Sequence, residues 1–301
     1  MDIAIMLEGQ MGLTWPRWQR IARLVEDLGF AGLYRSDHFV NPNPPDQASL
    51  ELWVSLVWLA SNTRRIEFGP LVSPVSFRHP AMTVRMASAV DDLSGGRLIL
   101  GIGAGWNERE HHNYSYDLLD TTARFARFEE AAQIITHLLR NDDSLTFAGH
   151  YYQFHDAVLL PRPQRPTPIL IGGNGERRTL SLVAQYADEW NAVYITAARF
   201  AELNTRLSEL LTARNRIPQT VRRSLMAGLY FGTDDAHLKR LLDENGATAE
   251  EARSRGILVG TPSALQDQHA ELAAAGVQRV MLQWLDLDAL DRLEALAHAV
   301  L

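Results

Sequence analysis

The chain has 301 residues, a net charge of −7 at neutral pH, no cysteine and a single lysine, Lys239. The acidic balance argues against a nucleic-acid-binding surface, and the absence of cysteine excludes disulfides, thiolate metal sites and cysteine nucleophiles. No apolar run approaches the roughly 18 residues of a membrane span, and the first twelve residues carry no basic leader region. We therefore expect one soluble, cytoplasmic domain over residues 1–301, with neither nucleic acid nor membrane as a partner.

The first half of the chain alternates between short apolar runs and amphipathic segments, the pattern of βα units. Strands are predicted at 2–7, 31–39, 66–72 and 97–106, and helices at 14–28, 50–64, 80–94 and 121–140. Pro80 and Gly95 stand where a helix tolerates a missing N–H and ends in a left-handed residue. Small residues gather at the ends of the third and fourth strands, where parallel sheets bind ligands.

The second half begins with a departure, an alternating segment at 141–166 that predicts a small β-hairpin inserted before the fifth strand. Further strands are predicted at 167–173, 191–195, 221–232 and 277–285, and helices at 175–190, 197–214, 234–255, 260–276 and 287–301. The helix at 234–255 is interrupted near Gly246. Eight strands alternating with helices predict an α/β fold of the (β/α)8 TIM barrel type.

An open, doubly wound sheet is the alternative fold. Its dinucleotide fingerprint is G-x-G-x-x-G between a strand and a helix. The two candidate segments, GIGAGW and GNGERR, have Trp106 and Arg178 at the position of the third glycine. The barrel is therefore preferred.

Asp37 and His38 end the second predicted strand, where side chains project into the mouth of a barrel. Imidazole exchanges a proton near neutral pH, and a neighbouring carboxylate fixes its tautomer or raises its pKa. A structural pair is the competing interpretation, because a dipeptide carries little information. The position at a strand end favours a catalytic role for both residues.

A glycine-rich loop follows the fifth strand. Backbone N–H groups of such a loop, ahead of a helix N-terminus, bind anions, and a neighbouring arginine adds charge. The competing interpretation is an ordinary turn with solvated arginines. No histidine pattern has the spacing of a metal site, so we expect no metal. The candidate phosphate-binding residues are Gly172, Gly173, Asn174, Gly175, Arg177 and Arg178.

Four segments together resemble the bacterial luciferase-like monooxygenase superfamily of flavin and deazaflavin enzymes. They are SDHF, the long run GPLVSPVSFRHPAMTVRMASAVDDLSGGRLILGIGAGWNEREH, the hairpin FAGHYYQFHDA, and PILIGGNGERRTLSLVAQYADEWN. The combination of SDHF and RHP is most similar to the branch that uses the deazaflavin coenzyme F-420. The resemblance implies an oxidoreductase that transfers hydride between F-420 and a small organic substrate. The alternatives are an FMN-dependent two-component monooxygenase and a flavin-binding relative without catalysis.

The resemblance also implies roles for particular residues. His38, with Asp37, matches the dipeptide beside the reactive face of the ring, where the histidine assists proton transfer. Family members hold a cis peptide bond in the third strand, and alignment through Ser73-Pro74 places it at Pro70-Leu71. The cofactor contacts implied by the two strand ends are Pro70, Leu71, Val72, Ser73, Gly103, Ala104, Gly105, Trp106 and Asn107. The glycine-rich loop matches the segment that approaches the cofactor phosphate. A glucose-6-phosphate substrate is disfavoured, because that enzyme holds the phosphate with lysines and Lys239 is the single lysine.

The helix at about 50–64 has apolar residues around most of its circumference, including Trp53 and Trp58. An outer barrel helix needs one apolar stripe to pack against the strands. A larger apolar surface left exposed indicates an interface with another protein chain. The alternative is burial beneath the chain's own loops. Luciferase-like proteins pair through this region, so we expect a homodimer with this helix in an isologous interface.

Overall fold

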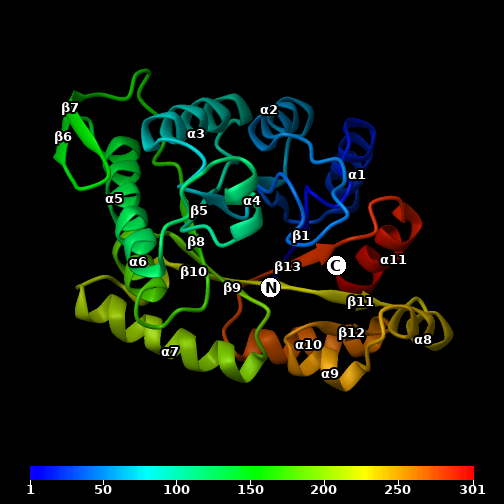
Figure 1. Ribbon diagram of the computed structural model, residues 1–301. Helices are drawn as coiled ribbons and strands as arrows, with labels where there is room; N and C mark the ends of the chain where they lie inside the picture. The colour runs from blue at the N-terminus through cyan, green and yellow to red at the C-terminus, as the bar shows by residue number, and fades with distance from the viewer.

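Nine parallel strands pair into one curved sheet in the computed structural model, which describes residues 1–301 (Figure 1). Their order in the sheet is β3-β2-β1-β13-β10-β9-β8-β5-β4. The strands are β1 Asp2–Leu7, β2 Gly32–Arg35, β3 Glu67–Pro70, β4 Ser73–Pro74, β5 Leu100–Gly103, β8 Ile169–Gly172, β9 Glu189–Val193, β10 Arg222–Ala227 and β13 Arg279–Trp284. Only Leu71 and Val72 separate β3 from β4, and β3 pairs with β2 while β4 pairs with β5. The sheet therefore closes as an eight-stranded ring, which confirms the predicted TIM barrel.

One outer helix follows each barrel strand, so the helices surround the sheet (Figure 1). They are α1 Trp15–Leu28, α2 Leu52–Asn62, α3 Pro80–Ser94, α5 Thr121–Arg140, α6 Thr179–Tyr186, α7 Ala197–Ala213, α10 Pro262–Ala274 and α11 Leu290–Val300. Gly29 and Gly95 end α1 and α3 in the left-handed conformation, with φ of 97° and 71°. This is the conformation that glycine adopts at least cost.

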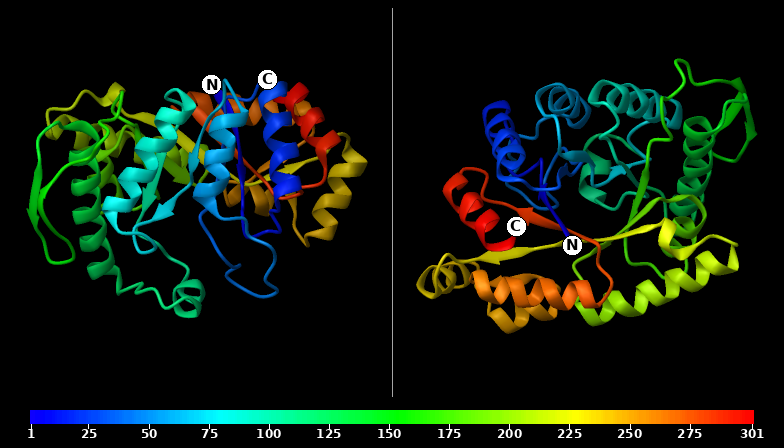
Figure 2. Two further views of the ribbon diagram at one scale, coloured as in Figure 1. Left: turned by 90° about the horizontal axis from the view of Figure 1, so that it is seen from above. Right: turned by 180° about the vertical axis from the view of Figure 1, so that it is seen from behind.

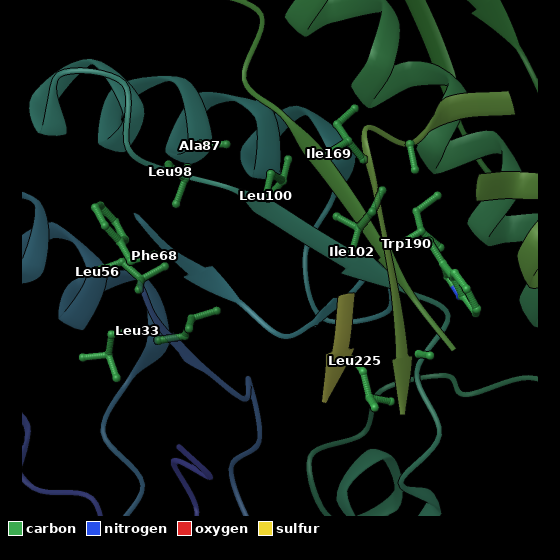
Figure 3. Close-up of a cluster of buried hydrophobic side chains, with 14 of the residues drawn as sticks. Leu33, Leu56, Phe68, Ala87, Leu98, Leu100, Ile102, Ile169, Trp190 and Leu225 are labelled. Atoms are coloured by element: carbon green, nitrogen blue, oxygen red, sulfur yellow. The ribbon is translucent and has the colours of Figure 1, made fainter. Parts of the chain in front are cut away.

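Strand residues alternate between two apolar layers, since successive side chains point to opposite faces. Outward-facing residues such as Leu33, Phe68 and Leu100 pack against helix residues such as Leu56 and Ala87 (Figure 3). A smaller cluster fills the interior of the barrel, and its members are Ala4, Met6, Tyr34, Leu71, Ile99, Leu170, Met226 and Met281. The barrel is thus packed inside, and space for a ligand remains only at its mouth.

Several segments lie outside the regular repeat. They are α4 Glu108–Asn113, the strands β6 Leu145–Ala148 and β7 Gln153–Ala157, the 3-10 helix at Pro218–Thr220, β11 Leu229–Phe231, α8 Asp235–Glu244, α9 Ala249–Ser254 and β12 Leu258–Gly260. β6 and β7 pair antiparallel between α5 and β8, in the segment where the sequence predicts a hairpin. The helix predicted at 234–255 is divided at Gly246, as expected.

Three predicted strands have different bounds in the structure. The strand predicted at 221–232 splits at Gly228, because β10 stays in the barrel while β11 pairs with β12 in a separate two-stranded sheet. The sixth barrel strand starts at Glu189 rather than at Asn191. The second ends at Arg35, so that Asp37 and His38 lie in the loop that follows it. The strand ends early because the side chains of Ser36 and Asp37 form hydrogen bonds with residues outside the strand pairing.

The cis peptide bond lies between Leu71 and Val72, so its predicted placement at Pro70-Leu71 is wrong by one position. The reason is the ladder with β2. Pro70 is still paired with Arg35, and the N–H of Leu71 donates to the carbonyl of Arg35 at 2.8 Å. The regular strand therefore continues through Pro70, and the break falls one residue later.

Most of the apolar surface of helix α2 is buried within its own chain. Leu52, Trp53, Leu56 and Leu59 are buried in the chain's core, with Trp53 only 4% exposed. Trp58 is half-buried beneath the guanidinium of Arg23, 5.9 Å from its ring centre. The large apolar side chains that face outward are Val54 and Val57, at 56% and 44% exposure. The expectation of apolar exposure around most of the helix is therefore wrong, and the exposed stripe is narrow.

Candidate active site

A cavity of about 770 Å³ opens at the carboxyl ends of the barrel strands. In Figure 2 (left) the loop after β2 and the segment between α4 and α5 project from this side, away from both chain termini. All eight barrel strands, or the loops that follow them, contribute to the lining, through residues that include Met6, His38, Val72, Gly103, Gly172, Val193, Met226 and Gln283. The cavity thus occupies the place where barrel enzymes bind ligands.

His38 and Glu110 form a buried pair on the cavity wall. The Nδ1 of His38 lies 2.9 Å from the Oε2 of Glu110, whose side chain is fully buried. The other carboxylate oxygen of Glu110 accepts the backbone N–H groups of Phe39 and Val40. Because Glu110 accepts a hydrogen bond from the Nδ1–H of His38, the Nε2 of His38 is the ring nitrogen without a partner in the chain.

Two opposing effects set the pKa of His38. Burial lowers it, but the hydrogen bond and the negative charge of Glu110 outweigh burial, and the pKa is raised above its ordinary value of 6.5. The charges of Glu8 and Asp37 add smaller contributions in the same direction. His38 is therefore poised to carry a proton around neutral pH, as a general acid requires.

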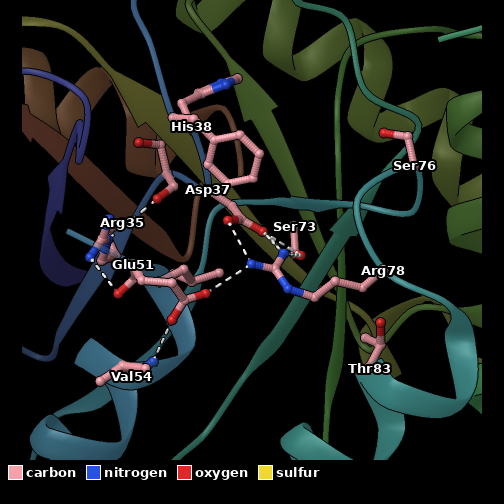
Figure 4. Close-up of polar contacts among 12 residues, drawn as sticks. Arg35, Asp37, His38, Glu51, Val54, Ser73, Ser76, Arg78 and Thr83 are labelled. Atoms are coloured by element: carbon pink, nitrogen blue, oxygen red, sulfur yellow. Dashed lines mark hydrogen bonds and ion pairs between the residues drawn. The ribbon is translucent and has the colours of Figure 1, made fainter. Parts of the chain in front are cut away.

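Asp37 does not line the cavity. Its carboxylate accepts the hydroxyl of Ser73 at 2.7 Å and forms an ion pair with Arg78, which also reaches Glu51 at 3.0 Å. Figure 4 shows Asp37 directed toward Ser73 and Arg78, while the imidazole of His38 points away from them. Asp37 therefore does not contact His38, because consecutive side chains point in different directions. Glu110 accepts the hydrogen bond from His38, and Asp37 contributes only its negative charge to the raised pKa of His38. Ser73 contacts Asp37 rather than the cavity.

The ends of β3 and β5 meet on one side of the cavity. Leu71, Val72 and the whole run from Gly103 to Trp106 line it, whereas Pro70 and Asn107 do not. Pro70 stays in the β3 ladder, and the Oδ1 of Asn107 caps α4 by accepting the N–H of Glu110 at 3.2 Å. A Cβ on Gly103 would lie 2.6 Å from a methyl group of Val72, so only glycine fits there. The rings of Trp106 and His38 pack edge to face, with 5.4 Å between the ring centres.

The glycine-rich loop after β8 reaches the cavity only in part. Gly172 and Gly173 line it together with Thr179, the first residue of α6. Asn174 instead bonds the backbone of Val193 through both side-chain atoms. Gly175 and the predicted anion-binding arginines, Arg177 and Arg178, are exposed and lie outside the lining. Arg178 packs over the ring of Phe125, 5.7 Å from its centre, so its guanidinium turns toward α5.

Arg124, rather than Arg177 or Arg178, is the arginine that lines the cavity. It lies on α5 and lines the cavity with Phe125, and its Nε is buried without a hydrogen-bond partner. It takes part in none of the chain's ion pairs. The sequence offered no local signal for Arg124, because α5 is distant from the glycine-rich loop in the chain and approaches it only in the folded barrel.

A polar wall, also missed from the sequence, completes the cavity. We define it as Glu8 and Gln10 after β1, Tyr194 after β9 and Gln283 on β13. These residues belong to no motif, and the strands that bring them together are separated by most of the chain. Their position at the ends of barrel strands is the one signal that marks them. No group of three or more histidine, aspartate or glutamate side chains is arranged to hold a metal ion.

Comparisons with known proteins agree with this geometry. The family model described as luciferase-like monooxygenase matches residues 4–281. The F420-dependent glucose-6-phosphate dehydrogenase of Kineococcus radiotolerans is 31% identical over 70% of this chain and 63% of its own length. The 4-hydroxyprotoasukamycin monooxygenase of Streptomyces nodosus subsp. asukaensis is 30% identical over 58% of this chain and 46% of its own. The chain thus spans less than two thirds of the length of either curated relative.

Among solved structures, the coenzyme F420-dependent tetrahydromethanopterin reductase of Methanopyrus kandleri superposes with a TM-score of 0.80. The match covers 100% of this chain and 99% of the other, at 17% sequence identity. At that identity the likeness supports the barrel fold and does not extend to the chemistry.

Proposed function

This chain belongs to the luciferase-like monooxygenase family, and from that premise we propose that it is an oxidoreductase dependent on coenzyme F-420. In this proposal hydride passes between the deazaflavin and a small organic substrate, and His38 handles the accompanying proton. The observation that carries the proposal is the pair of His38 and Glu110 on the wall of a cavity large enough for a cofactor ring and a substrate. The names of the relatives favour F-420 over other cofactors.

The residues around the cavity fit a phosphate-bearing ring cofactor. Gly103 and Gly172, at the ends of β5 and β8, make room for the side chain of Val72, which packs against both and gives a flat ring an apolar surface to lie on. Arg124 offers a buried Nε without a partner near Gly173 and Thr179, which suits a phosphate. We therefore assign the ring to Val72 and the segment 103–106, and the phosphate to the residues around Arg124.

When bound, the deazaflavin supplies the carbon that accepts or donates hydride. The chain's own part is to orient and to move a proton. Glu110 holds the Nδ1 proton of His38 and so directs Nε2 toward the substrate side. The raised pKa of His38 keeps a proton available at Nε2 up to a higher pH than for a free histidine. The ring of Trp106 lies against the imidazole of His38 nearly at a right angle and so helps to fix its orientation.

An FMN-dependent two-component monooxygenase is the second candidate, since a monooxygenase is among the relatives and such enzymes share the barrel. Equilibrium titration with F-420 and FMN side by side distinguishes the two. Tight binding of F-420 with weak binding of FMN is the expected result. Binding of FMN alone would favour the monooxygenase. Binding of F-420 without turnover of any compound in a broad substrate screen would leave the protein a non-catalytic binding relative.

We further propose a homodimer in the cytoplasm. The support for the dimer is the stripe of exposed Val54 and Val57 on α2, beside exposed Met82 on the neighbouring α3. A charge there would oppose burial of the stripe, so Val57→Glu should convert a dimer into monomers in analytical ultracentrifugation. Trp53 is unsuitable for this test because it is buried in its own chain. A wild-type protein that sediments as a monomer at micromolar concentration would overturn the dimer, and cell fractionation tests the location.

A further inference from the structure

The cavity has two chemically different halves. The residues assigned to the cofactor come from β3, β4, β5 and β8 and the segments that follow them, and β4, β5 and β8 are neighbours in the sheet. The polar wall of Glu8, Gln10, Tyr194 and Gln283 comes from the ends of β1 and β13, which lie across the ring from β8 and β5, and from the end of β9, which pairs with β8. A cofactor on the first half leaves the polar wall for the substrate, with His38, from the loop after β2, between them.

Hydrogen bonds fix the orientation of this wall. The Nε2 of Gln283 donates to one oxygen of Glu8 at 2.8 Å, and the Nε2 of Gln10 donates to the other at 2.9 Å. Gln10 in turn accepts the hydroxyl of Ser36 at 2.8 Å, and Gln283 accepts the hydroxyl of Tyr194 at 2.5 Å. Both amides therefore present their N–H groups to Glu8, which accepts on both oxygens as an ionised carboxylate does.

Glu8 has no cationic partner in the chain. It forms no ion pair, and each of its oxygens accepts a single bond, so that each retains a free lone pair. His38 is paired with Glu110. Arg35 lies buried behind the same loop, but its N–H groups are directed to the carbonyls of Ser36 and Leu50 and to the hydroxyl of Ser55. Among the carboxylates that line the cavity, Glu8 is the one without a charge partner.

We propose that Glu8 binds a protonated amine of the substrate, so that the physiological substrate is a small organic cation. This rests on the proposed function, because it takes the other half of the cavity for the cofactor. A half-buried carboxylate gains most from a ligand that brings both hydrogen-bond donors and a positive charge. A neutral hydroxyl supplies the donor without the charge. Burial raises the pKa of Tyr194 to about 12, so the phenol stays neutral and adds an acceptor beside Glu8.

A matched pair of probes, benzylamine and benzyl alcohol, tests the proposal. Each is titrated calorimetrically into the complex of the protein with F-420 at neutral pH, where the amine is protonated. We expect the amine to bind the wild-type complex about tenfold more tightly or better, the size of a charge-assisted bond. Glu8→Gln preserves the shape and removes the charge, so it should abolish the preference. Glu8→Asp retains the charge and should keep part of the preference for the amine.

The control is Glu294→Gln, an exposed glutamate on α11 outside the cavity, which should leave the preference unchanged. Equal binding of the two probes to wild type, or a preference that survives Glu8→Gln, overturns the proposal. Thermal unfolding of each variant shows whether it is folded. If Glu8→Gln does not fold, the comparison of the two probes on the wild type still decides the proposal, because equal binding overturns it. The preceding titration with F-420 separates the two hypotheses: its failure overturns the proposed function, whereas F-420 binding without amine preference overturns only the role of Glu8.

Discussion

The two ends of the barrel both contain buried charges, and they use them differently. At the amino-terminal end, Arg279 at the start of β13 donates to the hydroxyl of Tyr34 at 2.6 Å and pairs with Glu189 at 3.3 Å and with Glu67. Arg222, at the start of β10, also reaches Glu67 at 3.2 Å. The four charged residues of this plug, defined as these five residues, are all paired within the chain. Its two unpartnered atoms, the Nε of Arg279 and the Oε1 of Glu189, are buried away from the cavity.

At the mouth, several polar atoms have no partner in the chain. They are the Nε2 of His38, the Nε of Arg124 and the free lone pairs of Glu8. Buried polar groups are ordinarily satisfied within the fold, so those left open mark the surface that a ligand completes. The comparison shows that neither a buried charge nor an unpartnered atom alone indicates function, because the plug contains both. An unpartnered polar atom that lines a cavity does.

Removal of Arg279 should have the largest effect on the fold. Arg279→Met leaves Glu189 buried without its main cation, and burial already raises the pKa of that carboxyl. Breaking one side of a buried ion pair costs about 3–5 kcal/mol of unfolding free energy, measured by urea denaturation. The control is Arg206→Met, which removes an exposed pair with Glu209 and should change stability little. A loss no larger than in the control would show that the plug is not stabilising.

His38→Asn should do the opposite and affect catalysis more than stability. The amide N–H of asparagine can replace Nδ1 as donor to Glu110, while the proton at Nε2 is lost. We expect turnover to fall about 100- to 10,000-fold, the range for a general acid or base, with F-420 affinity nearly unchanged. Steady-state kinetics and cofactor titration measure the two quantities. A fall in unfolding free energy like that of Arg279→Met, with turnover preserved, would place His38 among the structural residues.

Replacement of Glu110 should reverse the direction in which the pKa of His38 is shifted, and with it the pH dependence of the stability that His38 contributes. In the wild type the pKa of His38 is raised, so the charged pair is complete at acid pH and is lost as pH rises through that pKa. In Glu110→Gln the effect of burial remains without the opposing carboxylate, so the pKa should fall below 6.5. Titration by NMR, with the signal assigned from its loss in His38→Asn, measures the shift. A wild-type value equal to that of Glu110→Gln would contradict the role of Glu110.

The sequence predicted the barrel well because the apolar periodicity and the helix boundaries are local signals. It also located His38, Val72 and the run 103–106 at the cavity, since each follows a recognisable strand. It did not pair Glu110 with His38, because which carboxylate meets His38 depends on the path of α4. Glu8 and Gln283 were missed for the same reason: their contact requires the pairing of β1 with β13, the first and last strands of the chain.

Asp37 separates the effect of position from the effect of partners. It lies near the mouth, but its carboxylate is paired within the chain, as the charges of the plug are. Its carboxylate is 2% exposed and contacts Ser73 and Arg78. Asp37→Asn keeps an acceptor for Ser73, and Arg78 retains Glu51, so only the charge of one pair is lost. We expect unfolding free energy to fall by about 1 kcal/mol, the difference between a charged and a neutral hydrogen bond, and turnover to stay within about threefold. Denaturation and kinetics on the same sample measure both, with Glu51→Gln as the matched variant of the second carboxylate. If Asp37→Asn instead lost turnover as His38→Asn does, position at the mouth rather than open partners would decide which residues act.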